Sequence, residues 1–224
     1  MTLTRSRGDG NGGNGIVIMP ADQKYANVVI WMHGLGDTAD VSVLNFILPT
    51  APTRPISLNG GFMMPGWTDV YGLDETSKED KEGFEQSAAR IQALIDSEKA
   101  KGIPAQRVVV AGFSQGGATA LHVALRTKDA LGGCVACSGW LPLAKEYPAA
   151  LGDGAKAGLK VLQCHGDADV VVRHHWGSQS YNALKAMGIA AELETYRGMG
   201  HSAIPDELER VSAFIQQQFR KACD

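Results

Sequence analysis

Short apolar runs alternate along the chain with segments whose apolar residues recur at helical spacing. The apolar runs predict strands near Ala26–Met32, Pro55–Leu58, Arg107–Phe113, Gly133–Ser138, Lys160–Cys164 and Ala191–Tyr196. The periodic segments predict helices near Lys81–Lys101, Gln115–Arg126, His174–Met187 and Pro205–Phe219. Strands that alternate with helices favour an α/β fold with a mostly parallel central sheet and helices on both faces.

Two of the predicted helices carry an apolar stripe along one face. The stripe of the first helix consists of Phe84, Ala88, Ile91 and Ile95. The stripe of the last helix consists of Leu208, Val211, Ile215 and Phe219. We expect both stripes to pack against the core rather than to form a binding surface.

The five residues Gly112-Phe113-Ser114-Gln115-Gly116 spell G-x-S-x-G between a predicted strand and a predicted helix. A serine at such a sharp turn has its hydroxyl pushed away from the backbone, and a side chain in place of either glycine would crowd the turn. This is the nucleophile elbow of the α/β-hydrolases, and it predicts Ser114 as a catalytic nucleophile. The alternative is an ordinary strand-to-helix turn, because a chain with 27 glycines can match the motif by chance.

A serine nucleophile needs a histidine base and an acid that orients it, in the chain order Ser, Asp or Glu, His. His201 follows one predicted strand, and Asp167 and Asp169 follow another. Since catalytic groups collect beyond the carboxyl ends of parallel strands, these residues fit a triad with Ser114. Asp167 can instead cap its own turn, so position alone leaves both aspartates open and favours Asp169.

The other histidines fit the role of the base less well. His165 ends a strand in a His-Gly turn and is expected to be structural. His174 and His175 open a predicted helix, His122 lies inside one, and His33 belongs to a separate loop.

That separate loop, His33-Gly34-Leu35-Gly36-Asp37, follows the strand near Ala26–Met32. Its glycines let backbone N–H groups turn toward a ligand. In α/β-hydrolases one oxyanion donor comes from such a loop and the other from the residue after the nucleophile. We therefore predict an oxyanion hole formed by the backbone N–H groups of Leu35 and Gln115. One alternative is a glycine-rich turn without a ligand. A phosphate-binding loop is a second alternative, which is disfavoured because neither phosphate-binding glycine motif is present.

Several stretches beyond these motifs resemble the acyl-protein thioesterases of the phospholipase/carboxylesterase family. They are His33-Gly34-Leu35-Gly36-Asp37-Thr38, Ala51-Pro52-Thr53-Arg54-Pro55, Gly112 to Gly117, Ser138-Gly139-Trp140-Leu141-Pro142-Leu143, Gln163-Cys164-His165-Gly166-Asp167-Ala168-Asp169 and Gly198-Met199-Gly200-His201-Ser202. They follow one another at compatible spacing from about Ile16 to Phe219. The resemblance implies an α/β-hydrolase fold, and it implies that the acid is the second aspartate of H-G-D-x-D, which is Asp169.

The chain departs from the family pattern in three places. Met1-Thr2-Leu3 lacks the N-terminal cysteine that is lipidated in members that cycle onto membranes. Ala39-Asp40-Val41-Ser42 replaces a Gly-His-Gly-Trp-like run, and Thr68 stands where an aromatic residue is usual. These loops flank the acyl site in the family, so the departures bear on chain-length and partner preference.

The composition fits one α/β domain with a sizeable core, with 224 residues, 44% hydrophobic and 20% charged. A net charge of −3 gives no reason to expect a nucleic-acid partner. No apolar run is long enough to span a membrane, and no signal segment is evident. Ser6 to Gly15 are glycine-rich and hold no large apolar residue. We therefore expect a flexible leader over residues 1–15 and a single α/β-hydrolase domain over residues 16–224.

The four cysteines are Cys134, Cys137, Cys164 and Cys223. Cys134 and Cys137 form a C-x-x-C motif, but residues three apart on a strand point to opposite faces. No second pair follows at zinc spacing. The sequence predicts buried free thiols and neither a metal nor an organic cofactor. Few cysteines and no signal segment indicate a reducing, cytoplasmic location.

The stretch from Asn59 to Lys81 is long, lacks periodicity and is rich in methionine and aromatic residues. Loops of this length are usually functional or disordered, and methionine is an adaptable lining for an apolar ligand. Trp140 belongs to a second apolar cluster just after a strand. We hypothesise an acyl-chain groove beside Ser114, and the alternative is a satellite cluster that closes the domain. The proposed lining residues are Met64, Trp67, Leu73 and Trp140.

Three functions are consistent with these residues. The first, implied by the resemblance, is hydrolysis of long-chain S-palmitoyl-type thioesters on proteins through an acyl-enzyme. The second is a carboxylesterase or lysophospholipase that acts on small or lipid oxoesters. The third, a non-catalytic interaction protein, is disfavoured because Ser114, Asp169 and His201 are all present. The expected partners are therefore S-acylated proteins or lipid and small esters, with transient contact to a membrane surface. The expected state is a monomer or a weak homodimer.

Overall fold

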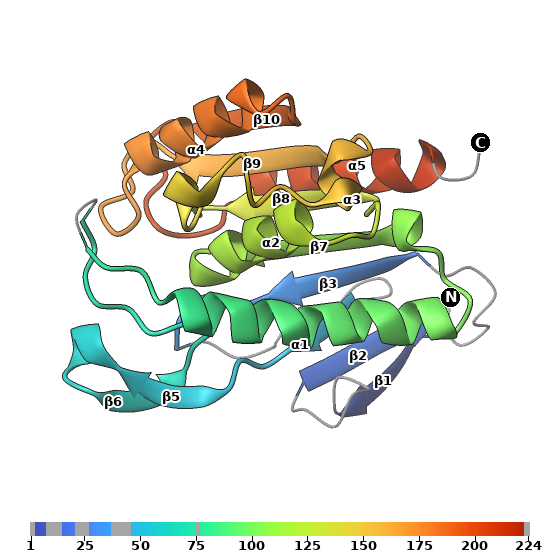
Figure 1. Cartoon of the computed structure of the whole chain (residues 1–224), viewed down its shortest axis with the longest axis horizontal. Helices are drawn as coiled ribbons and strands as arrows, with labels where there is room; N and C mark the ends of the chain where they lie inside the picture. Colours follow the sequence, from blue (N-terminus) through green and yellow to red (C-terminus); the bar gives the residue numbers. More distant parts are fainter. Residues whose placement is uncertain (1–2, 8–14, 21–26, 37–45, 75–76, 222–224) are drawn as a thin grey trace.

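A computed structural model of the chain describes residues 3–7, 15–20, 27–36, 46–74 and 77–221. Its main strands are β1 (Leu3–Arg7), β2 (Gly15–Pro20), β3 (Val28–Met32), β4 (Phe46–Pro49), β7 (Val108–Phe113), β8 (Gly133–Cys137), β9 (Lys160–Gly166) and β10 (Ala190–Tyr196). They form an eight-stranded sheet in the order β1-β2-β4-β3-β7-β8-β9-β10 (Figure 1). The strands from β4 to β10 in this order are parallel, and β2 pairs antiparallel with both β1 and β4.

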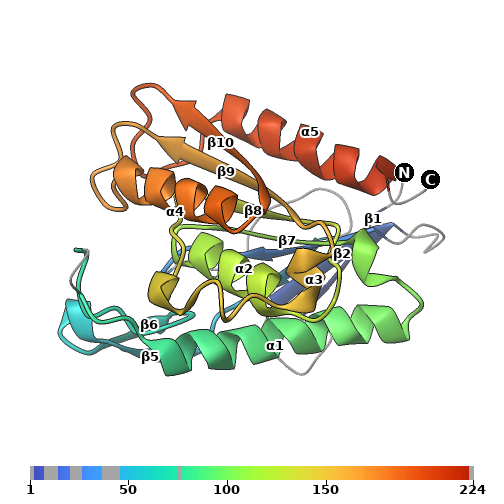
Figure 2. The same cartoon turned by 45° about the horizontal axis from the view of Figure 1, so that its top comes forward.

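Helices cover both faces of the sheet (Figure 2). The helices are α1 (Lys81–Ala100), α2 (Gln115–Arg126), α3 (Asp153–Lys156), α4 (His174–Ala186) and α5 (Pro205–Lys221). Core residues of α1 to α4 pack with one face of the sheet, and those of α5 pack with the other. The central parallel strands β3, β7, β8 and β9 are buried on both faces, as in other α/β folds, whereas the edge strand β10 is largely exposed. The predicted fold class is therefore confirmed.

A small two-stranded sheet lies apart from the main one, next to the start of α1 (Figures 1 and 2). Its strands are β5 (Thr53–Ile56) and β6 (Phe62–Pro65), which pair antiparallel. Gly60 and Gly61 close the turn with φ values of 65° and 82°, a region that glycine enters without steric cost. Phe62 and Met63 are exposed on this hairpin.

All ten predicted elements are present, with ends that differ by no more than three residues. The sequence did not predict β2, β4, β6 or α3, which are short. Leu3–Arg7 was expected to belong to a flexible leader and instead forms the edge strand β1, paired with β2. A strand with few apolar residues can form there because the backbone of β2 offers a hydrogen-bonding edge. Of the rest of that expected leader, residues 1–2 and 8–14 lie outside the described part, and Gly15 begins β2.

The two predicted apolar stripes differ in how fully their residues are buried. In α1, Phe84, Ile91 and Ile95 are buried as expected. In α5, Val211 and Ile215 are buried, but Leu208 is 51% exposed and its neighbour Glu207 is fully buried. The start of α5 is thus turned so that a carboxyl group, rather than the predicted leucine, faces the sheet.

Candidate active site

Ser114 lies between β7 and α2 in a strained backbone conformation, with φ 55° and ψ −122°. Its N–H donates a hydrogen bond of 2.8 Å to the carbonyl oxygen of Cys137 on the next strand. The flanking glycines are required by close backbone contacts. A Cβ atom on Gly116 would lie 2.1 Å from the carbonyl oxygen of Met32, and one on Gly112 would lie 2.4 Å from Gly116. The G-x-S-x-G motif therefore has the tight strand-to-helix geometry expected of a nucleophile elbow, and it is pressed against the end of β3.

His201 joins the other two predicted triad residues. Its Nε2 atom lies 2.9 Å from Oγ of Ser114, and its Nδ1 atom lies 2.7 Å from Oδ2 of Asp169. The ring of Phe113 packs against the imidazole with centroids 4.8 Å apart. Ser114 follows β7, Asp169 follows β9 and His201 follows β10, so the fold brings all three to the carboxyl edge of the sheet.

Asp169 is held in place by the loop that it begins. The carboxylate is buried, and its Oδ1 atom accepts hydrogen bonds of 2.9 Å from the backbone N–H groups of Val171 and Val172. The other oxygen, Oδ2, is thereby left to face His201. The group is fixed in the orientation that a triad acid needs.

A second histidine, His165, lies on the other side of Asp169. Its Nε2 atom is 3.5 Å from Oδ2 of Asp169 and 2.7 Å from the carbonyl oxygen of Val172. Burial lowers the pKa of His165, so the ring is neutral near pH 7. The sequence indicated only a structural role at a turn. The sequence did not indicate the contact of His165 with Asp169, because this contact depends on how the loop after β9 folds back.

Asp167, the alternative acid, is exposed and points elsewhere. Its Oδ1 atom accepts a hydrogen bond of 2.6 Å from the N–H of Gly198, and the N–H of Ala168 donates to the carbonyl oxygen of Met199. These bonds connect the loop of Asp169 to the loop of His201. Asp167 therefore helps to hold the two loops together. Among the described hydrogen bonds, none joins Asp167 to His201.

The predicted oxyanion loop approaches Ser114 closely. A Cβ atom on Gly34 would lie 3.7 Å from Cβ of Ser114 and 3.3 Å from the Phe113 ring. Leu35 comes next in this loop, and Gln115 is the first residue of α2. Both backbone N–H groups therefore belong to segments that border Ser114. Their role as oxyanion donors stays a prediction.

The side chain of Gln115 has a structural task that the sequence did not indicate. Its Oε1 atom accepts the backbone N–H of Trp67 at 2.7 Å, and its Nε2 atom donates to both the carbonyl and the hydroxyl oxygen of Thr68. All three residues are buried. Thr68, the departure from the family pattern, thus supplies a buried acceptor to the residue that follows Ser114.

The four residues of the hypothesised groove occupy different environments. Met64 is half-buried, and its Sδ atom would lie 3.6 Å from a Cβ atom on Gly36 in the predicted oxyanion loop. Trp140 is half-buried, and Leu73 is 47% exposed. Glu79 connects their segments because it accepts hydrogen bonds from Trp140 Nε1 at 3.4 Å and from the N–H of Leu143 at 2.9 Å.

The expectation for Trp67 is wrong, because its side chain is fully enclosed. Its Nε1 atom donates to the carbonyl oxygen of His33 at 2.9 Å, and its ring lies 5.3 Å from the His33 ring. A side chain without exposed surface cannot line an open groove. Trp67 instead supports the loop that carries Leu35, as a residue of the core.

Comparisons with known proteins agree with this geometry. The sequence matches the family described as Phospholipase/Carboxylesterase over residues 14–219. The chain belongs to the phospholipase/carboxylesterase family. Acyl-protein thioesterase 1 homolog 1 of Dictyostelium discoideum is 37% identical over 212 residues, which are 88% of this chain and 92% of that protein. Acyl-protein thioesterase 1 of Neurospora crassa is 36% identical and covers 93% of each chain.

A solved structure gives the same result. The crystal structure of Zea mays acyl-protein thioesterase 2 matches with a TM-score of 0.79 and 31% identity, over 97% of this chain and 99% of that chain. Membership of the phospholipase/carboxylesterase family makes the protein a serine hydrolase with the α/β-hydrolase fold. In the described part of the chain, no helix is both long and apolar enough to cross a membrane.

Proposed function

We propose that the protein is an acyl-protein thioesterase that hydrolyses long-chain S-acyl groups on protein cysteines. The observation that carries this proposal is the hydrogen-bonded series Ser114–His201–Asp169 within a family whose relatives bear the thioesterase name. Such a series turns a serine hydroxyl, which is a weak nucleophile at neutral pH, into a group that can attack an acyl carbon.

In the proposed first half-reaction, Nε2 of His201 takes the proton from Oγ of Ser114 as Oγ attacks the thioester carbonyl carbon. Asp169 stabilises the imidazolium that forms. The carbonyl oxygen gains negative charge and faces the N–H groups of Leu35 and Gln115, each of which can contribute roughly 10²–10³ in rate. The C–S bond then breaks, and the cysteine thiol leaves with the proton from His201.

The second half-reaction regenerates the enzyme. His201 removes a proton from water, and the hydroxide oxygen attacks the acyl-serine carbon. Collapse of this tetrahedral species breaks the bond to Ser114, and His201 returns the proton to the serine. A fatty acid is released. The residues named in these two steps complete the reaction without an added cofactor.

Substrate entry is proposed beside Met64 and Trp140. Both side chains are only half-buried. Met64 lies near the predicted oxyanion loop, and Trp140 follows the end of β8. The second candidate function, a carboxylesterase or lysophospholipase acting on oxoesters, uses the same residues and is separated from the first by the substrate alone. We further propose a cytoplasmic enzyme that is monomeric or weakly dimeric and contacts membrane surfaces transiently.

Covalent labelling with a fluorophosphonate tests the nucleophile. We expect one label per chain, mapped by mass spectrometry to Ser114, and no label on a Ser114→Ala variant that retains its circular dichroism spectrum. Ser202→Ala is the matched control, because Ser202 is an exposed serine next to His201 and its loss should leave labelling intact. Full labelling of the Ser114→Ala variant would refute the assignment.

A further inference from the structure

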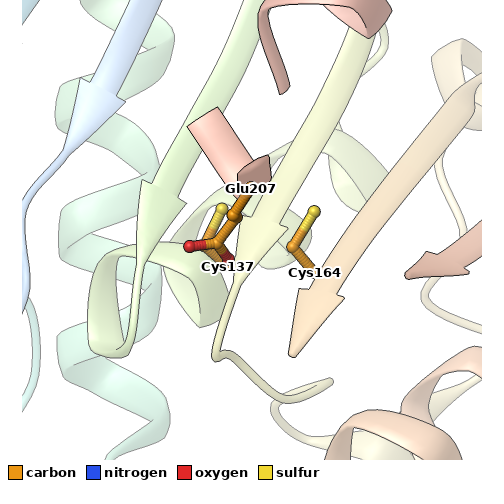
Figure 3. Close-up of side chains that lie close together, drawn as sticks. All are labelled: Cys137, Cys164 and Glu207. Carbon is orange, nitrogen blue, oxygen red and sulfur yellow. The ribbon is translucent and has the colours of Figure 1, made fainter. Parts of the chain in front are cut away.

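A second cluster of reactive side chains lies on the α5 side of the sheet. It consists of Cys137, Cys164 and Glu207 (Figure 3). The two thiol sulfurs and one carboxyl oxygen of Glu207 all lie within 4.8 Å of one another. All three residues are buried, and Glu207 has no exposed surface. None of them takes part in the proposed hydrolysis.

Neighbouring strands place the two thiols together. Cys137 at the end of β8 is the direct register partner of Cys164 on β9, so both side chains leave the same face of the sheet. Cys134, the other half of the C-x-x-C motif, packs in the core on the opposite face. The predicted separation of Cys134 and Cys137 is confirmed. The partner of Cys137 comes from the next strand, which the spacing of cysteines along the sequence does not indicate.

Glu207 completes the cluster from the first turn of α5. Neither of its carboxyl oxygens has a hydrogen-bond partner of good geometry among the described residues. Burial raises the pKa of Glu207, and the nearby Cys137 thiol and Ile204 N–H offset only part of that effect. A buried polar group without a proper partner is energetically costly, so this carboxyl group needs an explanation. A helix cap alone would leave the other oxygen unsatisfied.

The donor set indicates the kind of ligand. Thiolates favour zinc and other soft metals, and a carboxylate is also a common zinc ligand. With zinc–sulfur bonds of about 2.3 Å, two sulfurs lie about 3.8 Å apart at the tetrahedral angle. The two sulfurs, which lie within 4.8 Å of each other, therefore need to approach by no more than about 1 Å.

We propose that Cys137, Cys164 and Glu207 supply three of the four ligands of a zinc ion at this buried site. Both thiols give up their protons when the metal binds, so affinity rises with pH. The positive end of the α5 dipole lies at the same helix turn and favours the negative charge that three anionic ligands leave on the site.

The position of this cluster gives the ion a structural consequence. The carbonyl oxygen of Cys137 accepts the N–H of Ser114, and that of Cys164 accepts the N–H of Ser138, each at 2.8 Å. Glu207 follows closely after His201 in the chain. Zinc would therefore join β8, β9 and α5, the elements that border the nucleophile turn and the His201 loop.

The test uses a Cys223→Ser background, so that only the buried thiols are present. The protein is unfolded in urea with EDTA, refolded with or without one equivalent of Zn²⁺, and dialysed before zinc is counted by atomic emission. We expect one zinc per chain and a rise in Tm of about 5–10 °C at a hundredfold excess over Kd. Cys137→Ser and Cys164→Ser should each abolish both effects, and Glu207→Gln, which retains the side-chain volume, should weaken binding. Cys134→Ser, which removes a buried thiol from the opposite face, should retain them.

A second measurement uses protein in which all three proposed ligands are intact, so misfolding of the cysteine-to-serine variants cannot affect it. Refolding with Cd²⁺ should give an ultraviolet thiolate-to-metal absorption whose intensity corresponds to two thiolates per ion. The proposal is overturned if the Cys223→Ser protein refolds without retaining zinc. It is equally overturned if the cadmium absorption is absent, or if Cys134→Ser loses zinc as completely as Cys137→Ser does.

Discussion

The Nε2 atom of His165 lies 3.5 Å from Oδ2 of Asp169, the same oxygen that meets the ring of His201. His165 also bonds the carbonyl oxygen of Val172, whose N–H is bonded to Asp169. Asp169, the acid of the proposed triad, thus contacts both His165 and Val172, which are also bonded to each other. His165 therefore packs against both the carboxylate and the loop whose backbone N–H groups orient Asp169 toward His201.

We therefore predict that His165→Gln lowers kcat by about tenfold to hundredfold with little change in KM, because small displacements of a catalytic group are costly. Steady-state kinetics with a soluble thioester provides the measurement. His174→Gln is the control, because the edge of that ring packs on His165 but its own hydrogen bond goes to Thr195. An unchanged kcat in the His165→Gln variant would show that Asp169 is oriented without it.

Trp67 is predicted to act on stability rather than on substrate choice. Trp67→Phe leaves the buried carbonyl oxygen of His33 without its donor, which should lower the free energy of unfolding by about 1–3 kcal/mol. Urea denaturation measures this loss. Relative rates for short and long acyl chains should not change, and a shifted chain-length preference would place Trp67 in the groove after all.

Met64 and Trp140 are the two groove candidates that keep partial exposure. We predict that Met64→Ser and Trp140→Ala each reduce the ratio of kcat/KM for palmitoyl over short acyl thioesters by about tenfold, because they remove apolar contact with the distal chain. Leu208→Ser is the control, since Leu208 is an exposed apolar residue of α5. If both variants keep the wild-type ratio, the side chains form only a hydrophobic cluster that closes the domain.

His122 makes stability depend on pH. Burial, aided by Arg126, lowers its pKa from 6.5 to about 4, and its ring packs against Phe84. As the pH falls, His122 therefore becomes protonated near pH 6.5 in the unfolded chain but only near pH 4 in the folded chain. Stability from this group is complete above pH 6.5 and is lost as the pH falls toward 4, by on the order of 3 kcal/mol.

Urea unfolding of the wild type and His122→Gln across this pH window isolates the effect from that of the carboxylates. The variant should lose less stability than the wild type between pH 6.5 and pH 4. His175→Gln, at an exposed histidine of α4, should follow the wild type. Parallel curves for wild type and His122→Gln would contradict the assignment.

Local patterns predicted most of the fold and pointed to Ser114 and His201, whereas the choice of Asp169 over Asp167 rested on the family resemblance. The elbow glycines, the run Val108–Val110 and the helix after Ser114 each follow from short-range sterics and periodicity. Two strands were not predicted, Phe46–Pro49 and Phe62–Pro65, because a run of four residues that ends in proline carries almost no periodic signal. Their strand character comes from pairing with β2 and β5, which only the tertiary structure supplies.

Burial of single side chains was harder to predict where the chain turns sharply. Trp67 belongs to an aperiodic segment, and its burial follows from hydrogen bonds to Gln115 and His33, which are remote in sequence. At the start of α5, Leu208 fits the apolar spacing, but the helix is rotated so that Glu207 faces the sheet. Helical periodicity gives the spacing of a buried face, whereas tertiary contacts decide its exact rotation at a helix end.

The most direct test of the proposed function compares kcat/KM across acyl chains from short to palmitoyl, with matched thioesters and oxoesters of the same acyl group and Ser114→Ala as the blank. The account predicts that kcat/KM rises with chain length, that thioesters react faster than the matched oxoesters, and that the blank is inactive. A maximum at short chains with no advantage for thioesters would contradict a protein thioesterase and identify the enzyme as a general carboxylesterase.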